Sequence, residues 1–412
     1  MQTLGAILFG LALLHTFGAR QLEVLARRSP RHAGLLHLLG EVEVVFGFWA
    51  FVLVISMAFV QGSHRAIEYT ESLHYTEPLF VFVVMVIAAS RPVLVSVQHA
   101  LQLLARLSPL PTPLTMAWLG LAVVPLLGSL ITEPAAMTLA ALMLAPRIFR
   151  SDMPERLKYA ALGVLFVNIS IGGTLTSYAA PPVLMVAAAW QWDTAFMASQ
   201  IGWKAALAVL VNASAMVFFL RRQLTSAPPP DGTQVAIPFI VCLVHLLFLA
   251  GVVILAHHPV LFVGLFLFFL GYTQAYAEFQ SPLILKEGLL VGFFLAGLVV
   301  LGGMQQWWLQ PLVSAMQPAV LFFGALGLTA VTDNAALTYL GSLISGISDS
   351  SRYMLVTGAV TGGGLTVIAN APNPAGVALL RNGFADNSIG AGGLLAGAIA
   401  PTLVAALFFM LL

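Results

Sequence analysis

The chain has 412 residues, of which 60% are hydrophobic and only 8% are charged, and its formal net charge is +1. Soluble globular domains are about 25% charged, so this composition excludes a water-soluble fold. The single cysteine, Cys242, excludes an intrachain disulfide framework. We therefore expect an all-α membrane protein that crosses the bilayer many times.

Hydrophobic stretches of about 20 residues, the length that spans a bilayer as a helix, follow one another along the chain. In the first half we expect spans at 3–19, 42–61 and 78–100 (interrupted by Arg91-Pro92), a hairpin of two short helices at 115–146, a segment broken by Gly and Pro at 157–190, and a span at 194–220. In the second half we expect spans at 236–256, 260–279 and 286–303, a hairpin at 315–346, a broken segment at 353–380 and a span at 389–411. No basic region precedes residues 4–18, so we expect a retained first span rather than a cleaved signal peptide.

The placement of Lys and Arg tests this layout, because short cytoplasmic loops are enriched in these residues. If the hairpin at 115–146 enters and leaves on one side, 13 of the 17 Lys and Arg residues lie in cytoplasmic loops, with two outside and two within spans. A full crossing there would put the basic loops that follow it outside, so the charge pattern favours a re-entrant hairpin. The 13 are Arg20, Arg27, Arg28, Arg31, Arg106, Arg147, Arg150, Arg156, Lys158, Arg221, Arg222, Lys286 and Arg381.

This layout divides the chain into two repeats. Residues 1–220 form the first, 221–235 form a cytoplasmic linker, and 236–412 form the second. Each repeat has five crossings, one of them the broken helix, and a re-entrant hairpin. Because five is odd, the second repeat has the opposite orientation in the membrane. Inverted repeats with a binding site near the bilayer midplane are common among secondary transporters.

A short motif occurs in both hairpins and puts an acid at matched positions. Residues 132–138 (TEPAAMT) and 332–338 (TDNAALT) are identical at four of seven positions. An acid at bilayer depth costs roughly 2.5–3.5 kcal/mol on insertion scales, so such a residue is a candidate functional group. The candidates at these tips are Thr132, Glu133, Thr332, Asp333 and Asn334.

A second repeated motif follows each hairpin. Residues 172–182 (GGTLTSYAAPP) align with 363–373 (GGLTVIANAPN) when Gly173 is matched to Gly363, with one insertion. Glycines and prolines inside apolar runs break the helix and free backbone carbonyls, which is tolerated only where these groups line a site. Carbonyl and hydroxyl oxygens suit a hard cation such as sodium. The candidates here are Gly173, Thr174, Thr176, Gly363, Thr366, Asn370 and Asn373.

Three interpretations of the matched acids remain open. Glu133 and Asp333 could simply cap the helices that follow them, but a serine would cap without the cost of an acid in the membrane. Half-helix N-termini attract anions, but acids at those ends would repel a carboxylate or an oxyanion. A cation fits both features, and a proton would compete with it for the same carboxylate. We therefore predict exchange of sodium for protons at this site.

Other charged residues carry weaker predictions. Lys204 lies within its span, where it could pair with a site acid or extend to the membrane interface. Four further acids are interpreted as interfacial caps, with a place on a proton path as the alternative. They are Glu41, Glu43, Glu77 and Glu287.

The hairpin tips and the Gly-Gly and Pro-rich breaks, repeated in inverted halves, resemble the ion-transporter superfamily. That superfamily includes sodium/dicarboxylate symporters, arsenite permeases and NhaD-type sodium/proton antiporters, and the acids at the tips look most like the antiporter branch. Dicarboxylate-binding relatives commonly carry Ser-Asn-Thr at these tips, which this chain lacks. The resemblance implies a homodimer in which a mobile transport domain moves past a static scaffold in an elevator-like motion.

We thus predict a secondary transporter, a cation/proton antiporter of the bacterial inner membrane. A phosphate-binding loop of the GxxxxGK[ST] type is absent from the sequence, so a coupled ion gradient would supply the energy. We expect no enzyme activity, no cofactor and no nucleic-acid partner, with lipid, a monovalent cation and the proton as partners. The alternatives are a sodium-coupled symporter of a small anion and a non-transporting membrane protein with the same fold.

Overall fold

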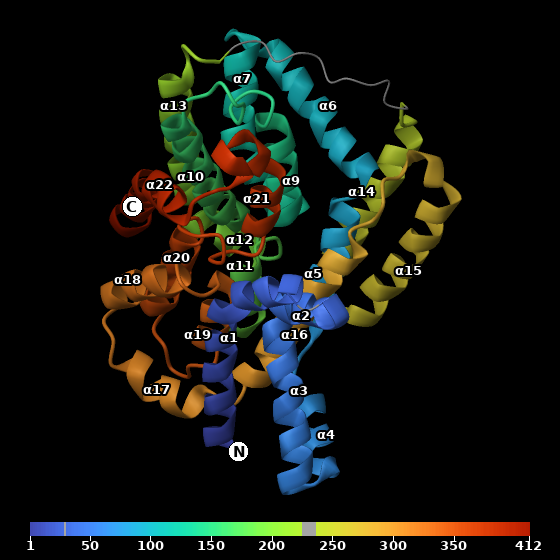
Figure 1. The fold of residues 1–412 in the computed structure, drawn as a ribbon, viewed down its shortest axis with the longest axis vertical. Coiled ribbons are helices and arrows are strands. Elements are labelled where there is room, and N and C mark those ends of the chain that lie inside the picture. Colours follow the sequence, from blue (N-terminus) through green and yellow to red (C-terminus); the bar gives the residue numbers. More distant parts are fainter. Residues whose placement is uncertain (29, 225–235) are drawn as a thin grey trace.

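The computed structural model describes residues 1–28, 30–224 and 236–412. Over these ranges the chain is helical and has no strand, which confirms the prediction of an all-α membrane protein (Figure 1). Six continuous helical stretches in the described part are long and apolar enough to cross a membrane. They are Glu43–Gln61, Thr112–Ile131, Glu155–Leu175, Thr194–Leu220, Leu285–Gly302 and Ala391–Leu411.

The first six helices mostly follow the predicted spans, with a break inside the third. Residues 78–100 were expected as one interrupted span, and the structure ends one helix at Ala88 and begins the next at Arg91, with Pro92 in its first turn. Proline fits this position because the first turn of a helix leaves its N–H groups unpaired. The helices are α1 (Gln2–Arg28), α2 (Ala33–Gly40), α3 (Val42–Gln61), α4 (Ser63–Glu71), α5 (Thr76–Ala88) and α6 (Arg91–Leu107).

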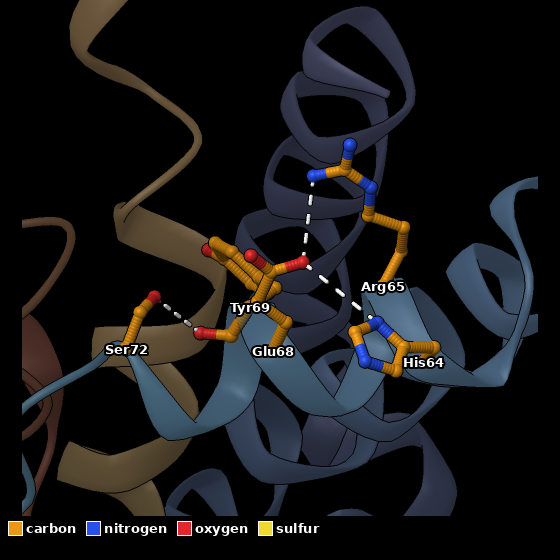
Figure 2. Close-up of polar contacts among 5 residues, drawn as sticks. All are labelled: His64, Arg65, Glu68, Tyr69 and Ser72. Carbon is orange, nitrogen blue, oxygen red and sulfur yellow. Dashed lines mark hydrogen bonds and ion pairs between the residues drawn. The ribbon is translucent and has the colours of Figure 1, made fainter.

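Short helix α4 has one polar face and one face that packs on the protein. His64 and Arg65 each approach the carboxylate of Glu68, at 4.0 and 3.4 Å (Figure 2). On the packed side, the Tyr69 hydroxyl donates a hydrogen bond of 2.6 Å to the carbonyl of Val300 in α16. The sequence analysis predicted no helix here, because nine residues with several charges resemble a loop.

The middle of the chain contains the first predicted hairpin and broken segment. Two π-helical turns, Leu119–Val123 and Ala198–Gly202, interrupt the longer helices. The elements are α7 (Thr112–Trp118), α8 (Val124–Ile131), α9 (Glu133–Leu144), α10 (Glu155–Gly172), a 3₁₀ turn (Gly173–Leu175), α11 (Pro181–Trp190), α12 (Thr194–Met197) and α13 (Trp203–Leu220). Helix α9 packs along α8, the π turn and α7, so the two arms of the hairpin are antiparallel.

The last part of the chain ends with the second predicted hairpin and broken segment, in the same order as in the first half. Of the predicted linker 221–235, residues 225–235 lie outside the described part. The helices are α14 (Phe239–Ile254), α15 (Pro259–Ala275), α16 (Leu285–Gly302), α17 (Gln306–Ser314), α18 (Pro318–Thr329), α19 (Asn334–Ser342), α20 (Asp349–Gly362), α21 (Asn373–Leu380) and α22 (Ala391–Leu411). Four isolated 3₁₀ turns complete the described elements: Pro30–His32, Ala277–Phe279, Arg381–Gly383 and Ala385–Asn387.

Each hairpin contacts a helix from the broken segment of the opposite half of the chain. Helix α9 of the first hairpin contacts α21, and helix α19 of the second hairpin contacts α11. Helices α10, α13, α20 and α22 pack beside them, while α14 and α15 contact α5 on the other side of the molecule (Figure 1). Each hairpin therefore presents its tip to the broken segment of the other half.

Two pairs of glycines allow close helix crossings. A Cβ at Gly163 of α10 would lie 2.2 Å from the carbonyl carbon of Gly397 in α22, and one at Gly297 of α16 would lie 2.3 Å from the backbone nitrogen of Gly47 in α3. Small residues let membrane helices approach closely, so that backbone packing replaces the hydrophobic effect as the driving force. Each of these crossings joins a helix of the first half of the chain to a helix of the second half.

Candidate functional site

The first hairpin turns sharply at Thr132. Helix α8 ends at Ile131 and α9 begins at Glu133, so a single residue joins them. Thr132 has a φ of +72°, a conformation that a β-branched residue rarely adopts and that costs about 1–3 kcal/mol. Its side chain is buried, and its Oγ1 has no hydrogen-bond partner. Strain of this kind concentrates at functional sites.

Glu133 is completely enclosed, with an exposed fraction of 0%. Its Oε2 accepts a hydrogen bond of 2.8 Å from Nδ2 of Asn370, which lies between α20 and α21. Its Oε1 has no partner and faces Gly173, where a Cβ would lie 2.7 Å away. Glu133 forms no ion pair with any described residue. A buried carboxylate without compensation is strongly disfavoured, so this group requires a cation or a proton.

Asp333, at the matched position, has a different environment. Its Oδ1 accepts hydrogen bonds of 2.8 and 3.1 Å from the backbone N–H groups of Ala335 and Ala336, and so caps α19. The capping alternative therefore describes Asp333, whereas Glu133 makes no capping bond. Asp333 and Thr332 also line a cavity of about 490 Å³, so Asp333 is only partly buried.

Three fully buried asparagine side chains are held in place by hydrogen bonds that their amide nitrogens donate. Nδ2 of Asn373 donates to the carbonyls of Gly363 and Thr366 at 2.8 and 2.9 Å. Nδ2 of Asn370 donates to Glu133, and Nδ2 of Asn334 lies 3.4 Å from Oγ of Ser170. In all three the amide oxygen accepts no hydrogen bond. Carbonyls and a carboxylate can only accept, and the Ser170 hydroxyl already donates to Val360. The amide nitrogens must therefore be the donors, which leaves each amide oxygen facing away from these partners.

Unpartnered buried oxygens are thus found on both hairpin tips and on the second broken segment. Buried polar groups without partners are rare in folded proteins, and each calls for an explanation. One carboxylate, three amide oxygens and one hydroxyl are ligands of the kind that hard cations prefer. The five atoms are Thr132 Oγ1, Glu133 Oε1, Asn334 Oδ1, Asn370 Oδ1 and Asn373 Oδ1.

Two of the candidate threonines, Thr176 and Thr366, hydrogen-bond the broken segments to the hairpins. Oγ1 of Thr176 donates to the carbonyl of Ser129 in α8 at 2.7 Å, and Oγ1 of Thr366 donates to the carbonyl of Ala330 after α18 at 2.8 Å. The two aligned threonines therefore form equivalent bonds in the two halves. Thr174 instead donates within its own segment, to the carbonyl of Ile171 at 2.6 Å.

Replacing Thr176 or Thr366 with valine should loosen a hairpin from its broken segment. Valine keeps the shape but leaves the hairpin carbonyl unpaired, which costs about 1–3 kcal/mol. We expect a lower melting temperature and a several-fold weaker apparent affinity for sodium in each variant. Thr332→Val is the control, because the Thr332 hydroxyl bonds within its own hairpin, to the carbonyl of Leu328 in α18. Equal changes of melting temperature and sodium affinity in Thr176→Val and Thr332→Val would contradict a role of Thr176 in holding the hairpin to the broken segment.

Gly173 and Gly363 leave space for the polar groups of the site. A Cβ at Gly363 would lie 2.9 Å from Nδ2 of Asn334, which parallels the approach of Gly173 to Glu133. The matched glycines therefore occupy equivalent places beside the matched hairpin tips.

Gly173→Ala should displace the Glu133 carboxylate. A methyl 2.7 Å from Oε1 is closer than van der Waals contact allows, so we expect at least a tenfold weaker apparent affinity for the transported cation. Gly264→Ala in α15 is the matched control, because its Cβ would meet no atom within 4 Å. Transport assays of the two purified variants measure the difference. Unchanged affinity in Gly173→Ala would remove Oε1 from the site.

Lys204 does not approach the site acids. Its Nζ donates to the hydroxyl of Tyr353 at 2.9 Å and lies 4.5 Å from the centre of that ring. The Tyr353 hydroxyl in turn donates to the carbonyl of Phe409. The structure thus gives Lys204 a tyrosine partner in place of the acid that the sequence analysis considered.

Ser170 was not among the predicted site residues, and Glu43 was interpreted as a cap. Ser170 lies in α10, donates to the carbonyl of Val360 at 2.7 Å, and contacts Asn334 of the other half. Its position, two residues before Gly172-Gly173, was the available signal. Glu41 and Glu43 were interpreted as interfacial caps, but both line the cavity that contains Asp333.

Comparisons with known proteins give one similar solved structure and a family. The crystal structure of the YdaH transporter from Alcanivorax borkumensis, which has an unusual topology, matches 90% of this chain and 97% of that chain with a TM-score of 0.45 and 15% identity. A search of curated proteins found no match. A family model described as "Putative Na+/H+ antiporter" matches residues 1–412. Because this match covers the whole chain, the protein belongs to that family, an integral membrane transporter family.

Proposed function

We propose that this protein exchanges sodium for protons across the membrane and binds both at Glu133. The observation that carries the proposal is the enclosed carboxylate of Glu133, which has no basic partner in the described part and has four unpartnered neutral oxygens in the segments around it. The family supports a cation/proton antiporter, and the oxygen ligands support sodium as the cation.

The chemistry of this carboxylate couples the two ions. Sodium on Oε1 neutralises Glu133 and occupies the neighbouring amide oxygens. A proton on Oε1 also neutralises Glu133 and turns it into a donor for one of those oxygens. The empty site would instead carry a buried negative charge, which is costly within the bilayer. Only the site with sodium or a proton bound therefore moves readily across the membrane, so each ion is transported in exchange for the other.

The alternating movement is proposed to follow the inverted repeats, 1–220 and 236–412. The exchange of partners between the hairpins and the broken segments supports this division, as do the equivalent bonds of Thr176 and Thr366. In this proposal the hairpins and broken segments form the moving unit, and α14 and α15 belong to a static scaffold. Re-entrant hairpins, a homodimer, an elevator-like motion, the ion-transporter superfamily and the bacterial inner membrane remain predictions.

The test uses the purified protein in proteoliposomes with a pH-sensitive dye inside. Adding sodium outside should drive protons out of the vesicles, and lithium and potassium identify the selectivity. The runner-up, a sodium-coupled symporter of a small anion, would instead accumulate a labelled carboxylate or oxyanion under the same gradient. Anion uptake without proton movement would contradict the proposal.

A further inference from the structure

The cavity of about 490 Å³ lies between the hairpin site and the helices α1, α3 and α16. One wall contains Thr332, Asp333 and residues 367, 368, 370 and 371, and the other contains residues of those three helices. Helix α16 contacts both α3 and α19 (Figure 1). Residues of all three helices line the cavity. Much of the wall is apolar, with Leu13, Phe17, Phe46, Val291 and Phe294 among its residues.

Two acids outside the hairpin line this cavity. Glu41 forms an ion pair of 2.9 Å with Lys286 at the first turn of α16. Glu43, in the first turn of α3, forms no ion pair with a described residue. Three charged groups interact electrostatically with Glu43: Glu41, just before α3, Lys286 of α16, and Asp333 of the second hairpin.

The cavity adjoins Asn370, the hydrogen-bond partner of Glu133. Asn370 is fully buried, lines the cavity, and has an amide oxygen without a partner. Its Nδ2 holds Glu133. Asn370 thus connects the cavity that Glu43 lines with the ion site behind it.

We infer that Glu43 is the proton relay of this exchanger, a group that passes protons between the cavity and the hairpin site without binding the transported cation. The inference rests on the proposed exchange. Sodium needs several oxygen ligands, but the two acids near Glu43 are engaged elsewhere: Glu41 pairs with Lys286, and Asp333 caps α19. A proton needs only one carboxylate oxygen. Protonated Glu43 releases its proton to water in the cavity, the proton reaches the carboxylate of the site, and Glu43 is then protonated again from the aqueous side.

The experiment separates proton movement from sodium binding in the full-length protein in proteoliposomes. Exchange of ²²Na⁺ for unlabelled Na⁺ needs no proton, whereas sodium-driven dye quenching does. Glu43→Gln should slow sodium-driven proton movement at least tenfold and should leave ²²Na⁺/Na⁺ exchange within twofold of wild type. Glu287→Gln is the matched control, because Glu287 is also in a first turn but is exposed and outside the cavity lining. It should leave both rates unchanged.

Two further results decide the inference. Glu43→Asp keeps a carboxylate and should restore most of the proton movement, which a merely structural role would not require. Wild-type rates of both processes in Glu43→Gln would overturn the inference, as would loss of both processes in a variant with a wild-type melting temperature. A wild-type protein without ²²Na⁺/Na⁺ exchange would instead refute the proposed function itself, so the two failures are distinguishable.

Discussion

Glu133→Gln should abolish sodium-dependent proton movement while leaving the protein folded. Glutamine keeps an oxygen for the hydrogen bond from Asn370 but removes the charge that the cation neutralises. We expect the apparent dissociation constant for sodium to rise at least 100-fold, or about 2.8 kcal/mol at 1.4 kcal/mol for each tenfold change. Dye quenching in proteoliposomes and ²²Na⁺/Na⁺ exchange should both fall to background.

Thermal unfolding is the control for this variant. An amide is less costly to bury than an uncompensated carboxylate, so without sodium the melting temperature should equal or exceed that of the wild type. A ligand stabilises the state that binds it, by about 2.7 kcal/mol at 100 times its dissociation constant. Sodium should therefore stabilise the wild type against heat and not the variant. Wild-type exchange rates in Glu133→Gln would exclude this carboxylate as the carrier.

Asp333→Asn should reduce transport strongly through the loss of charge alone. Asparagine is as good a helix cap as aspartate, so the hydrogen bonds to the N–H groups of Ala335 and Ala336 should persist. Removing the carboxylate from the cavity lowers its attraction for cations, and we expect at least a tenfold lower rate of exchange at low sodium concentration. The effect should shrink in high salt, because screening weakens the field of an accessible charge.

Asp333→Ser is the matched comparison, because serine also caps a helix and is also neutral. Both variants should lose exchange to a similar degree and retain the wild-type melting temperature within a few degrees. Wild-type exchange in both would reduce Asp333 to a cap of α19. Loss of stability in Asp333→Ser alone would show that the length of the side chain matters more than its charge.

The repeated motifs marked both hairpin tips, but they did not distinguish the environments of the two acids. The echo of 132–138 in 332–338 correctly marked two helix starts after tight connections. The difference between Glu133 and Asp333 depends on Asn370, which is 237 positions from Glu133, and on a cavity wall supplied by α1, α3 and α16. Contacts over such separations leave no periodic trace in a single sequence.

Hydrophobic length predicted the long helices better than the short ones. The expected span at 42–61 coincides with α3, and 194–220 coincides with the stretch from α12 to α13. Helices α2, α4 and α17 were not predicted, because eight or nine residues are too few for a clear apolar period. The π turns at 119–123 and 198–202 were also missed, since they depend on how neighbouring helices pack.

Equilibrium binding of ²²Na⁺ to the purified wild-type protein as a function of pH is the most direct test of the ion site. If sodium and a proton compete for one carboxylate, the amount of sodium bound at saturation should stay constant while its apparent dissociation constant rises as pH falls. In the acidic limit the rise should approach tenfold for each pH unit, and Glu133→Gln should bind no sodium at any pH. Sodium binding that is independent of pH, or that persists in Glu133→Gln, would contradict exchange at Glu133.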